Sequence, residues 1–204
     1  MKIYGHPMST CTRKVLMTLA ETNTPHEFVM VDLFKGEHKQ PSFLAHQPFG
    51  QVPALQDGAF ELYESRAMCR YINDKVKGAL VPNDLGARAQ MEQWISIESS
   101  NFTNPVMKFV FHHVFKREQT PETLKTAGEQ TSNALAIMDK QLANHPFIAG
   151  ETFTLADICF MPYIEYAMAT PAKDLFTKHP HVMAWWNKIS EKPTWRKIAG
   201  RAAA

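Results

Sequence analysis

Cysteine is scarce in this chain, and its scarcity argues against a disulfide-rich protein and against a cysteine-ligated metal protein. Only three of the 204 residues are cysteines (Cys11, Cys69 and Cys159), and they show neither C-x-x-C nor metal-binding spacing. An odd, widely spaced set of thiols does not form a disulfide framework and favours free, buried thiols in a reducing compartment. We therefore expect no metal site.

Charge of one sign and long apolar runs are also lacking. Twenty-two Lys and Arg against twenty Asp and Glu give a formal net charge of +2, and no basic block appears, which argues against nucleic acid as a partner. No apolar run reaches the roughly 18 residues that span a membrane, and the N-terminus lacks a signal-peptide profile. With 45% hydrophobic and 21% charged residues, we expect a soluble cytoplasmic protein with one large or two small domains and no membrane partner.

The first fifteen residues predict a strand that passes into a helix. Lys2–Gly5 is short and apolar, His6-Pro7 turns the chain, and from Thr10 the apolar residues recur on one helical face (Val15, Leu16, Leu19 and Ala20). Ser9 stands at this junction. Unpaired N–H groups and the macrodipole make a helix N-terminus favourable for an anion, including a thiolate. Ser9 either serves an anion there or only caps the helix.

The pattern up to residue 79 alternates strands and helices. Glu27–Val31 predicts a second strand, parallel to the first, and Pro41–His46 a short helix. Asp57-Gly58 between two apolar runs predicts a hairpin, after which Ser65 is expected to cap a third helix. The order β-α-β-α-β-β-α fits a thioredoxin-like domain over residues 1–79. A cis bond at Val52-Pro53 would expose the Val52 backbone to a ligand, but the sequence leaves this geometry open.

Residues 80–86 read as a linker, and residues 87–204 as an all-helical domain. Apolar spacing predicts one long helix from Ala87 to about Lys116, kinked at Pro105, and another from Pro121 to about Asn144. Two short terminal helices follow at 180–190 and 194–199, with tryptophans as core anchors (Trp185, Trp186 and Trp195).

Thr154 and Asp157 have the spacing of a capping box at the start of a further helix. Phe153 and Ile158 flank this pair in the positions of a hydrophobic staple. We interpret this motif as structural. Glu98, on the otherwise apolar stripe of the long helix, is expected to mark a bend or a buried hydrogen bond.

The ordered motifs of the chain resemble the cytosolic glutathione transferases, in particular their phi class. The resemblance is carried by residues 5–15 (GHPMSTCTRKV), residues 47–53 (QPFGQVP) and Glu64-Ser-Arg-Ala67. In the second half it is carried by Ala149-Gly150, Leu155-Ala-Asp157, Met161-Pro162 and residues 181–186 (HVMAWW). The likeness covers nearly the whole chain. It implies an α/β thioredoxin-like domain followed by an all-α domain.

The resemblance also implies a role for each matching residue. Ser9 would donate a hydrogen bond to the sulfur of glutathione, and the Val52 backbone would pair with the cysteinyl part of that tripeptide. Glu64 and Ser65 would hold the γ-glutamyl end. The glycyl carboxylate and nearby backbone would contact His38, Lys39 and Gln51.

The pocket for the electrophile is harder to read from the sequence. Its candidates are Met8, Phe34, Phe109 and His113, although a core role fits the aromatic residues equally well. Phe49 either inserts into a partner subunit, as the resemblance to a dimeric family suggests, or packs within its own domain.

Cys11 departs from the phi-class pattern, which has a small residue at this position. It is either a buried small side chain or a redox participant.

The implied protein is a homodimeric enzyme that needs no cofactor. It ionises glutathione, its co-substrate, and adds the sulfur to a hydrophobic electrophile. Two alternatives stay open. One is glutathione-dependent peroxide or disulfide reduction on the same fold, and the other is a non-catalytic interaction module.

Overall fold

The computed structural model describes residues 1–201 and divides into two compact units. The first unit comprises Met1–Val81 with residues 197–201, and the second comprises Pro82–Arg196. The division falls inside the segment 80–86 that was predicted to be a linker. Part of that segment is ordered against the first unit, because Leu80 and Val81 are buried and the Leu80 N–H donates to Asn73 Oδ1 at 3.0 Å.

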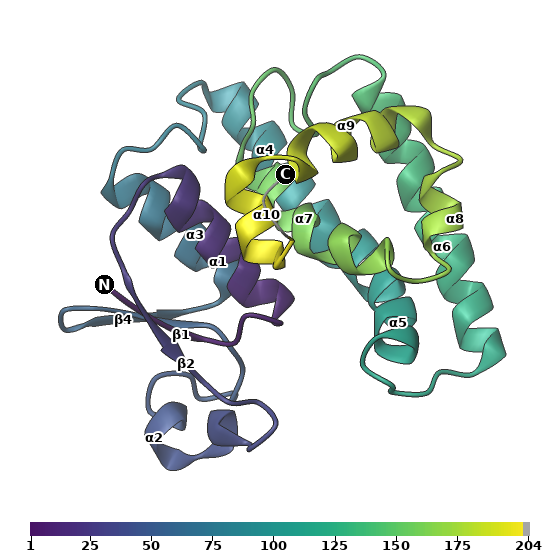
Figure 1. The fold of residues 1–204 in the computed structure, drawn as a ribbon. Coiled ribbons are helices and arrows are strands. Elements are labelled where there is room, and N and C mark those ends of the chain that lie inside the picture. The colour runs from purple at the N-terminus through teal and green to yellow at the C-terminus, as the bar shows by residue number, and fades with distance from the viewer. Residues whose placement is uncertain (202–204) are drawn as a thin grey trace. The chain divides into compact units, whose positions relative to one another are not determined.

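The first unit has the predicted β-α-β-α-β-β-α order (Figure 1). Its elements are β1 (Lys2–Gly5), α1 (Thr10–Glu21), β2 (Glu27–Met30), the 3₁₀ turn η1 (Glu37–Lys39), α2 (Pro41–Leu44), β3 (Ala54–Asp57), β4 (Phe60–Tyr63) and α3 (Ser65–Lys75). The strands lie in the order β2-β1-β3-β4, with β1 parallel to β2 and antiparallel to β3, and with β3 antiparallel to β4. The thioredoxin-like fold predicted for this region is confirmed.

Helices cover both faces of this sheet. α1 and α3 lie on one face and α2 on the other, as Figure 1 shows. Gly5 faces α1 so closely that a Cβ atom there would lie 2.6 Å from Thr12 Cγ2, and only glycine permits that approach. On the α2 side, Tyr4 and Val52 are partly buried and pack against a buried apolar cluster (Val31, Phe43 and Ala54).

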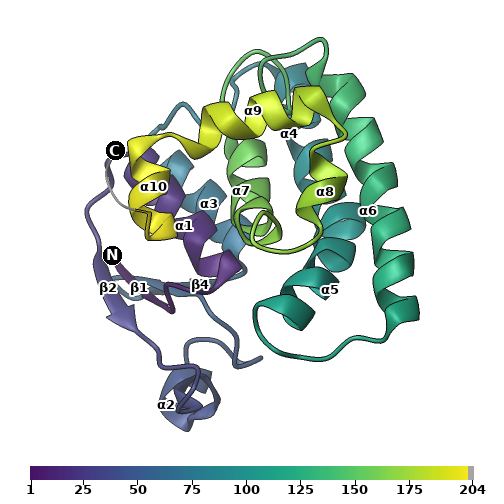
Figure 2. The ribbon, with the colours of Figure 1, turned by 45° about the vertical axis from the view of Figure 1, so that its right-hand side comes forward.

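The second unit is a bundle of helices (Figure 2). Its elements are α4 (Leu85–Ile97), the π-helix η2 (Glu98–Phe102), α5 (Thr103–His113), α6 (Pro121–Leu142), α7 (Leu155–Ala167), α8 (Lys173–Phe176), α9 (Pro180–Ser190) and the start of α10 (Pro193–Ala199), whose residues from Lys197 are assigned to the first unit. α7 is buried along almost its whole length and packs against α4, α5 and α9. The predicted anchors Trp185, Trp186 and Trp195 are buried. The all-helical prediction is confirmed, and α8 is an element that sequence patterns had not indicated.

The prediction of a single kinked helix over residues 87–116 is wrong in one respect. The helix is interrupted by η2, in which the Thr103 N–H donates to the carbonyl of Glu98, five residues earlier. Pro105 lacks the N–H that would pair with the carbonyl of Asn101, so regular α-helical bonding fails just ahead of it. Glu98 is fully buried and accepts a hydrogen bond from the Thr103 hydroxyl, which confirms the buried hydrogen bond expected of it.

A buried carboxylate closes the start of α7. Asp157 Oδ2 accepts from the Thr154 N–H at 2.8 Å, and Asp157 Oδ1 accepts from the Ile148 N–H at 3.0 Å and Trp185 Nε1 at 2.9 Å. Burial raises the pKa of the Asp157 carboxyl above its ordinary value, while these donors oppose the rise. The predicted capping box is confirmed, and it also ties α7 to α9 and to the loop before it.

Replacing this carboxylate is expected to destabilise the protein. Asp157→Ala leaves the buried donors of Ile148, Thr154 and Trp185 without an acceptor, so the free energy of unfolding should fall by about 3 kcal/mol. Urea denaturation followed by circular dichroism measures this change. Asp174→Ala, at an exposed carboxylate of α8, is the control and should change stability by less than about 0.5 kcal/mol. Equal midpoints for the two variants would contradict the assignment.

Candidate functional site

The strand register brings the predicted binding segments to one edge of the sheet. Gly5 pairs with Met30, Tyr4 pairs with Ala54, and Ala54 pairs with Tyr63. The ends of β1, β2 and β4 and the start of β3 therefore share that edge. Every residue predicted to bind glutathione lies on a segment that enters or leaves the sheet there: 6–9, 31–39, 51–53 and 64–65.

Ser9 is the N-cap of α1. Its Oγ accepts a hydrogen bond from the Thr12 N–H at 3.2 Å, and its backbone is extended (φ −74°, ψ 124°). The capping interpretation is thus confirmed. Because the hydroxyl oxygen accepts, its hydrogen is left to donate, and the described residues offer it no acceptor. The half-buried Ser9 side chain therefore combines a hydroxyl donor with the positive end of a twelve-residue helix.

Val52 lies just outside the paired part of β3. The register of β3 with β1 begins at Ala54, so the Val52 N–H and C=O take no part in the sheet ladder. The Val52-Pro53 peptide bond is cis, which decides the point that the sequence left open. This arrangement leaves one backbone residue beside the sheet edge with donor and acceptor unused by strand pairing.

Glu64 and Ser65 form the second helix start at this edge. The prediction that Ser65 caps α3 is wrong, because Ser65 is the first helical residue and Glu64 holds the cap position. A single residue must turn the chain from β4 into α3, and it does so with φ 71°, a conformation that costs a non-glycine residue about 1–3 kcal/mol. Glu64 is exposed, whereas Ser65 is only 4% exposed. An exposed carboxylate and a buried hydroxyl therefore lie on neighbouring residues.

The segment of residues 32–51, called here the α2 segment, carries the other predicted contacts. Lys39 Nζ donates to the carbonyl of Phe49 at 3.1 Å, and the Gln51 N–H donates to Gln47 Oε1 at 3.2 Å. His38 Nδ1 is buried without a hydrogen-bond partner among the described residues. His38, Lys39 and Gln51 are thus held by contacts within one short stretch.

Gly50 makes the folding of the α2 segment possible. It adopts φ +60°, and a Cβ atom there would lie 2.8 Å from the His38 carbonyl oxygen and 2.9 Å from Lys39 Nζ. Sequence reasoning missed this role, although a glycine between Phe49 and Gln51 is the residue type that such a close approach requires.

The candidates for the electrophile pocket are divided between the two units. In the first unit Met8 is 39% and Phe34 81% exposed, and Phe34 meets the His6 ring edge-on with centroids 5.7 Å apart. In the second unit Phe109 is buried, and its ring faces Gly128 of α6. His113 ends α5, and its pKa is lowered by burial and by the neighbouring His112 and Lys116.

The chain matches known protein families along most of its length. Residues 1–74 match the family description "Glutathione S-transferase, N-terminal domain", and residues 102–193 match "Glutathione S-transferase, C-terminal domain". Glutathione S-transferase F7 of Arabidopsis thaliana is 38% identical over 208 residues, covering 97% of this chain and 98% of the relative. The chain belongs to the glutathione S-transferase family. Its relatives place it with the phi-like cytosolic members.

Solved structures agree with this assignment. The crystal structure of glutathione transferase F7 from Populus trichocarpa has a TM-score of 0.92 and 40% identity, over 98% of this chain and 97% of that one. Glutathione S-transferase I from maize, solved with an atrazine–glutathione conjugate, has a TM-score of 0.89 and 31% identity, over 98% and 96%. The fold class predicted from sequence is therefore the fold of the family.

The cysteines of this transferase differ in their surroundings. Cys69 and Cys159 are buried, and burial raises the pKa of the Cys69 thiol to about 11. Cys11 is half-buried, which lies between the two alternatives weighed for it. Within residues 1–201, no group of three or more His, Cys, Asp or Glu side chains is arranged to hold a metal ion.

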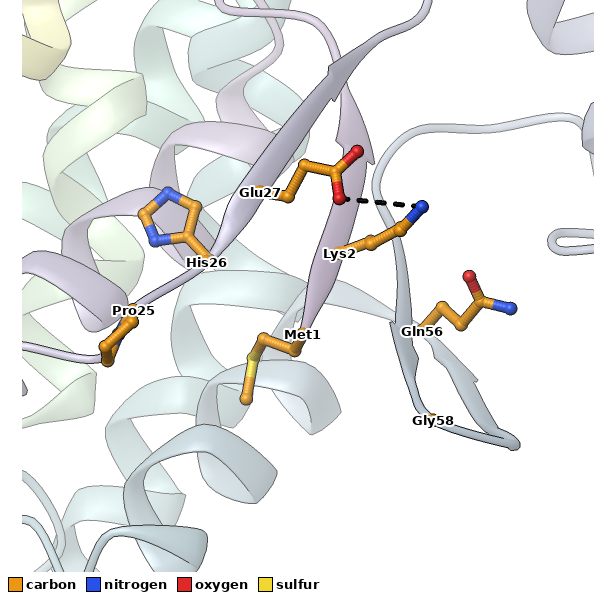
Figure 3. A pocket seen from close by; sticks show the side chains of 7 residues that line it. All are labelled: Met1, Lys2, Pro25, His26, Glu27, Gln56 and Gly58. Carbon is orange, nitrogen blue, oxygen red and sulfur yellow. Dashed lines mark ion pairs between the residues drawn. The ribbon is translucent and has the colours of Figure 1, made fainter.

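A separate pocket of about 540 Å³ lies at the opposite edge of the sheet (Figure 3). It is lined by Met1, Lys2, Pro25, His26, Glu27, Gln56 and Gly58, and Lys2 Nζ lies 3.5 Å from Glu27 Oε2. It contains none of the predicted site residues. The candidate site of this transferase is therefore the edge that carries the starts of α1 and α3.

No helix in the described part of the chain is both long and apolar enough to cross a membrane.

The close approach at Gly50 has a matched control in Gly58. Both glycines have a positive φ (+60° and +63°), but nothing lies within 4 Å of a Cβ atom at Gly58. Gly58→Ala should cost about 1 kcal/mol of stability through its backbone conformation alone. Gly50→Ala should cost about 2 kcal/mol more, because the added Cβ also collides with the His38 carbonyl. Chemical denaturation measures both, and equal losses would refute the packing argument.

Proposed function

We propose that this chain is a serine-type glutathione transferase in which Ser9 donates a hydrogen bond to the glutathione sulfur. The observation that carries the proposal is the Ser9 hydroxyl at the N-terminus of α1, with its oxygen engaged by the Thr12 N–H and its hydrogen available. The thiolate formed there attacks a hydrophobic electrophile.

The chemistry follows from the acidity of a thiol. A free thiol has a pKa near 8.5 and is mostly protonated at neutral pH, whereas the thiolate is the nucleophile. Thiols at helix N-termini are acidified by about one to several pKa units. A hydroxyl donor together with the dipole of α1 therefore raises the fraction of reactive sulfur at pH 7.

The rest of the tripeptide is bound by charge and backbone complementarity. Glu64 receives the α-ammonium of the γ-glutamyl group, and Ser65, at the start of the eleven-residue α3, donates to its carboxylate. The Val52 backbone pairs with the cysteinyl unit. His38, Lys39 and Gln51 take the glycyl end, for which the unpartnered His38 Nδ1 is a ready hydrogen-bonding group. The atrazine–glutathione conjugate held by the maize relative supports this class of substrate.

The electrophile is expected to contact Met8, Phe34, Phe109 and His113, and the enzyme is expected to act in the cytoplasm as a homodimer. Phe49 is 65% exposed and touches Tyr63 edge-on, with ring centroids 6.1 Å apart. An exposed phenyl ring in this position suits insertion into a partner subunit, because a large apolar side chain in water is unfavourable.

Variants of Ser9 separate catalysis from capping. Ser9→Gly keeps a residue suited to an N-cap but removes the hydroxyl, so it should cost only a few tenths of a kcal/mol of stability. Its kcat/KM for glutathione and a haloarene at pH 6.5 should fall at least about tenfold, and the pH–rate profile should move to higher pH. Ser9→Thr keeps both functions and should retain most activity. Full activity in Ser9→Gly would refute the serine mechanism.

Cys11→Ser tests the alternative of redox chemistry. Haloarene conjugation should stay within about twofold of wild type, because Cys11 is assigned no catalytic role. Peroxidase and mixed-disulfide assays on the same variant provide the comparison. Loss of conjugation in Cys11→Ser, with retention in Ser9→Gly, would replace the serine assignment with a cysteine one.

A further inference from the structure

Contacts within the α2 segment tie residues near its two ends together, and this has consequences for the site. The Lys39–Phe49 and Gln51–Gln47 hydrogen bonds and the close packing of Gly50 against His38 close the segment on itself. A shift of the segment therefore moves His38, Lys39 and Gln51 together. The remaining site residues lie just before β3 (Val52) and at the starts of α1 and α3, outside the segment.

Two side chains of the segment, three residues apart, hold it on the sheet. Phe43 is buried in the apolar cluster with Val31 and Ala54. His46 stacks on Tyr4 of β1, with ring centroids 4.5 Å apart and planes inclined by 20°. A cavity of about 370 Å³ opens beside them, lined in part by Tyr4, Glu37 and His46, so apolar packing alone does not fill this face.

His46 also takes part in a closed set of contacts with side chains of three strands, made of three hydrogen bonds and the stack on Tyr4. His46 Nδ1 lies 2.7 Å from Glu61 Oε1 of β4, and a carboxylate only accepts, so Nδ1 carries the hydrogen. Gln56 Nε2 of β3 donates to the same Glu61 oxygen at 3.4 Å, and the Tyr4 hydroxyl donates to Gln56 Oε1 at 3.0 Å. These four side chains (His46, Tyr4, Gln56 and Glu61) are called here the His46 clamp.

We propose that His46 is a positioning residue for glutathione binding, acting through Glu61 and Tyr4 to fix the α2 segment on the sheet. The inference rests on the proposed function, because it concerns the distance between the two halves of that glutathione site. The hydrogen bonds and the ring stack of the clamp join its four side chains to one another, and not to Ser9 or the starts of α1 and α3. Its loss should therefore weaken glutathione binding while leaving the step at sulfur intact.

Kinetics of His46→Phe and Glu61→Met test this inference. His46→Phe keeps the stacking on Tyr4 but loses the hydrogen bond, and Glu61→Met keeps a side chain of similar length but removes the acceptor. We expect each to raise the KM for glutathione about tenfold, with kcat at saturating glutathione within about twofold of wild type. The double variant should show no further rise in the KM for glutathione, because both changes remove the same contact between residues 46 and 61.

The chain offers a matched control in a second histidine–glutamate pair. His145 Nδ1 lies 2.9 Å from Glu151 Oε1 in the second unit, so His145→Phe removes a similar contact elsewhere. This variant should keep wild-type KM and kcat. A wild-type KM in His46→Phe, or a fall in kcat with KM unchanged, would overturn the inference.

Hydrogen exchange separates the inference from the proposed function. The amides of Phe43, Leu44 and Gln47, which bond within the segment, should exchange faster in His46→Phe, whereas those of α1 should not change. Unchanged exchange in the segment would refute the clamp. A wild-type protein without transferase activity would instead refute the proposed function, and the exchange result would still decide whether His46 holds the segment.

Discussion

The pairing of β1 with its two neighbours is the constraint on which the site depends. β1 runs parallel to β2 and antiparallel to β3, so the ends of three strands and the start of the fourth meet at one edge. Two helices begin on segments that leave that edge, and the first N–H groups of a helix have no partners within the helix. Chemistry that needs stabilised anions is thus a consequence of strand order, and individual side chains refine it.

The second unit rests on a different principle. Its central helix α7 is buried along nearly its full length, and a buried carboxylate at its first turn accepts from three donors, on the preceding loop, the N-cap residue and α9. An apolar helix surrounded by others would tolerate small rotations, because apolar contacts have little directionality. The hydrogen bonds to Asp157 remove that freedom and fix the helix in register with α9.

Much of this structure could be predicted from sequence, for physical reasons that differ between elements. Periodicity and turn chemistry located the strands and helices of the first unit, because the Asp57-Gly58 hairpin and the Ser9 cap are local signals. The break at η2 was harder to place, since Pro105 marks a bend but the π-helix forms several residues earlier, around a buried Glu98. Ser65 looked like a cap because serine usually is one, whereas the strand-to-helix turn required Glu64 in that place. The roles of Gly50 and His46 depend on contacts across the fold, which no local pattern contains.

The burial of two cysteines has a consequence for a protein that handles electrophiles. Reagents that react with glutathione also alkylate protein thiols, and the thiolate form is the vulnerable one. Cys69 is buried with a pKa near 11 and Cys159 is equally inaccessible, so neither offers a nucleophile to such reagents. Cys11 alone among the three is partly open to solvent. The fold thereby shields the thiols of both cores from the compounds that the site is proposed to consume.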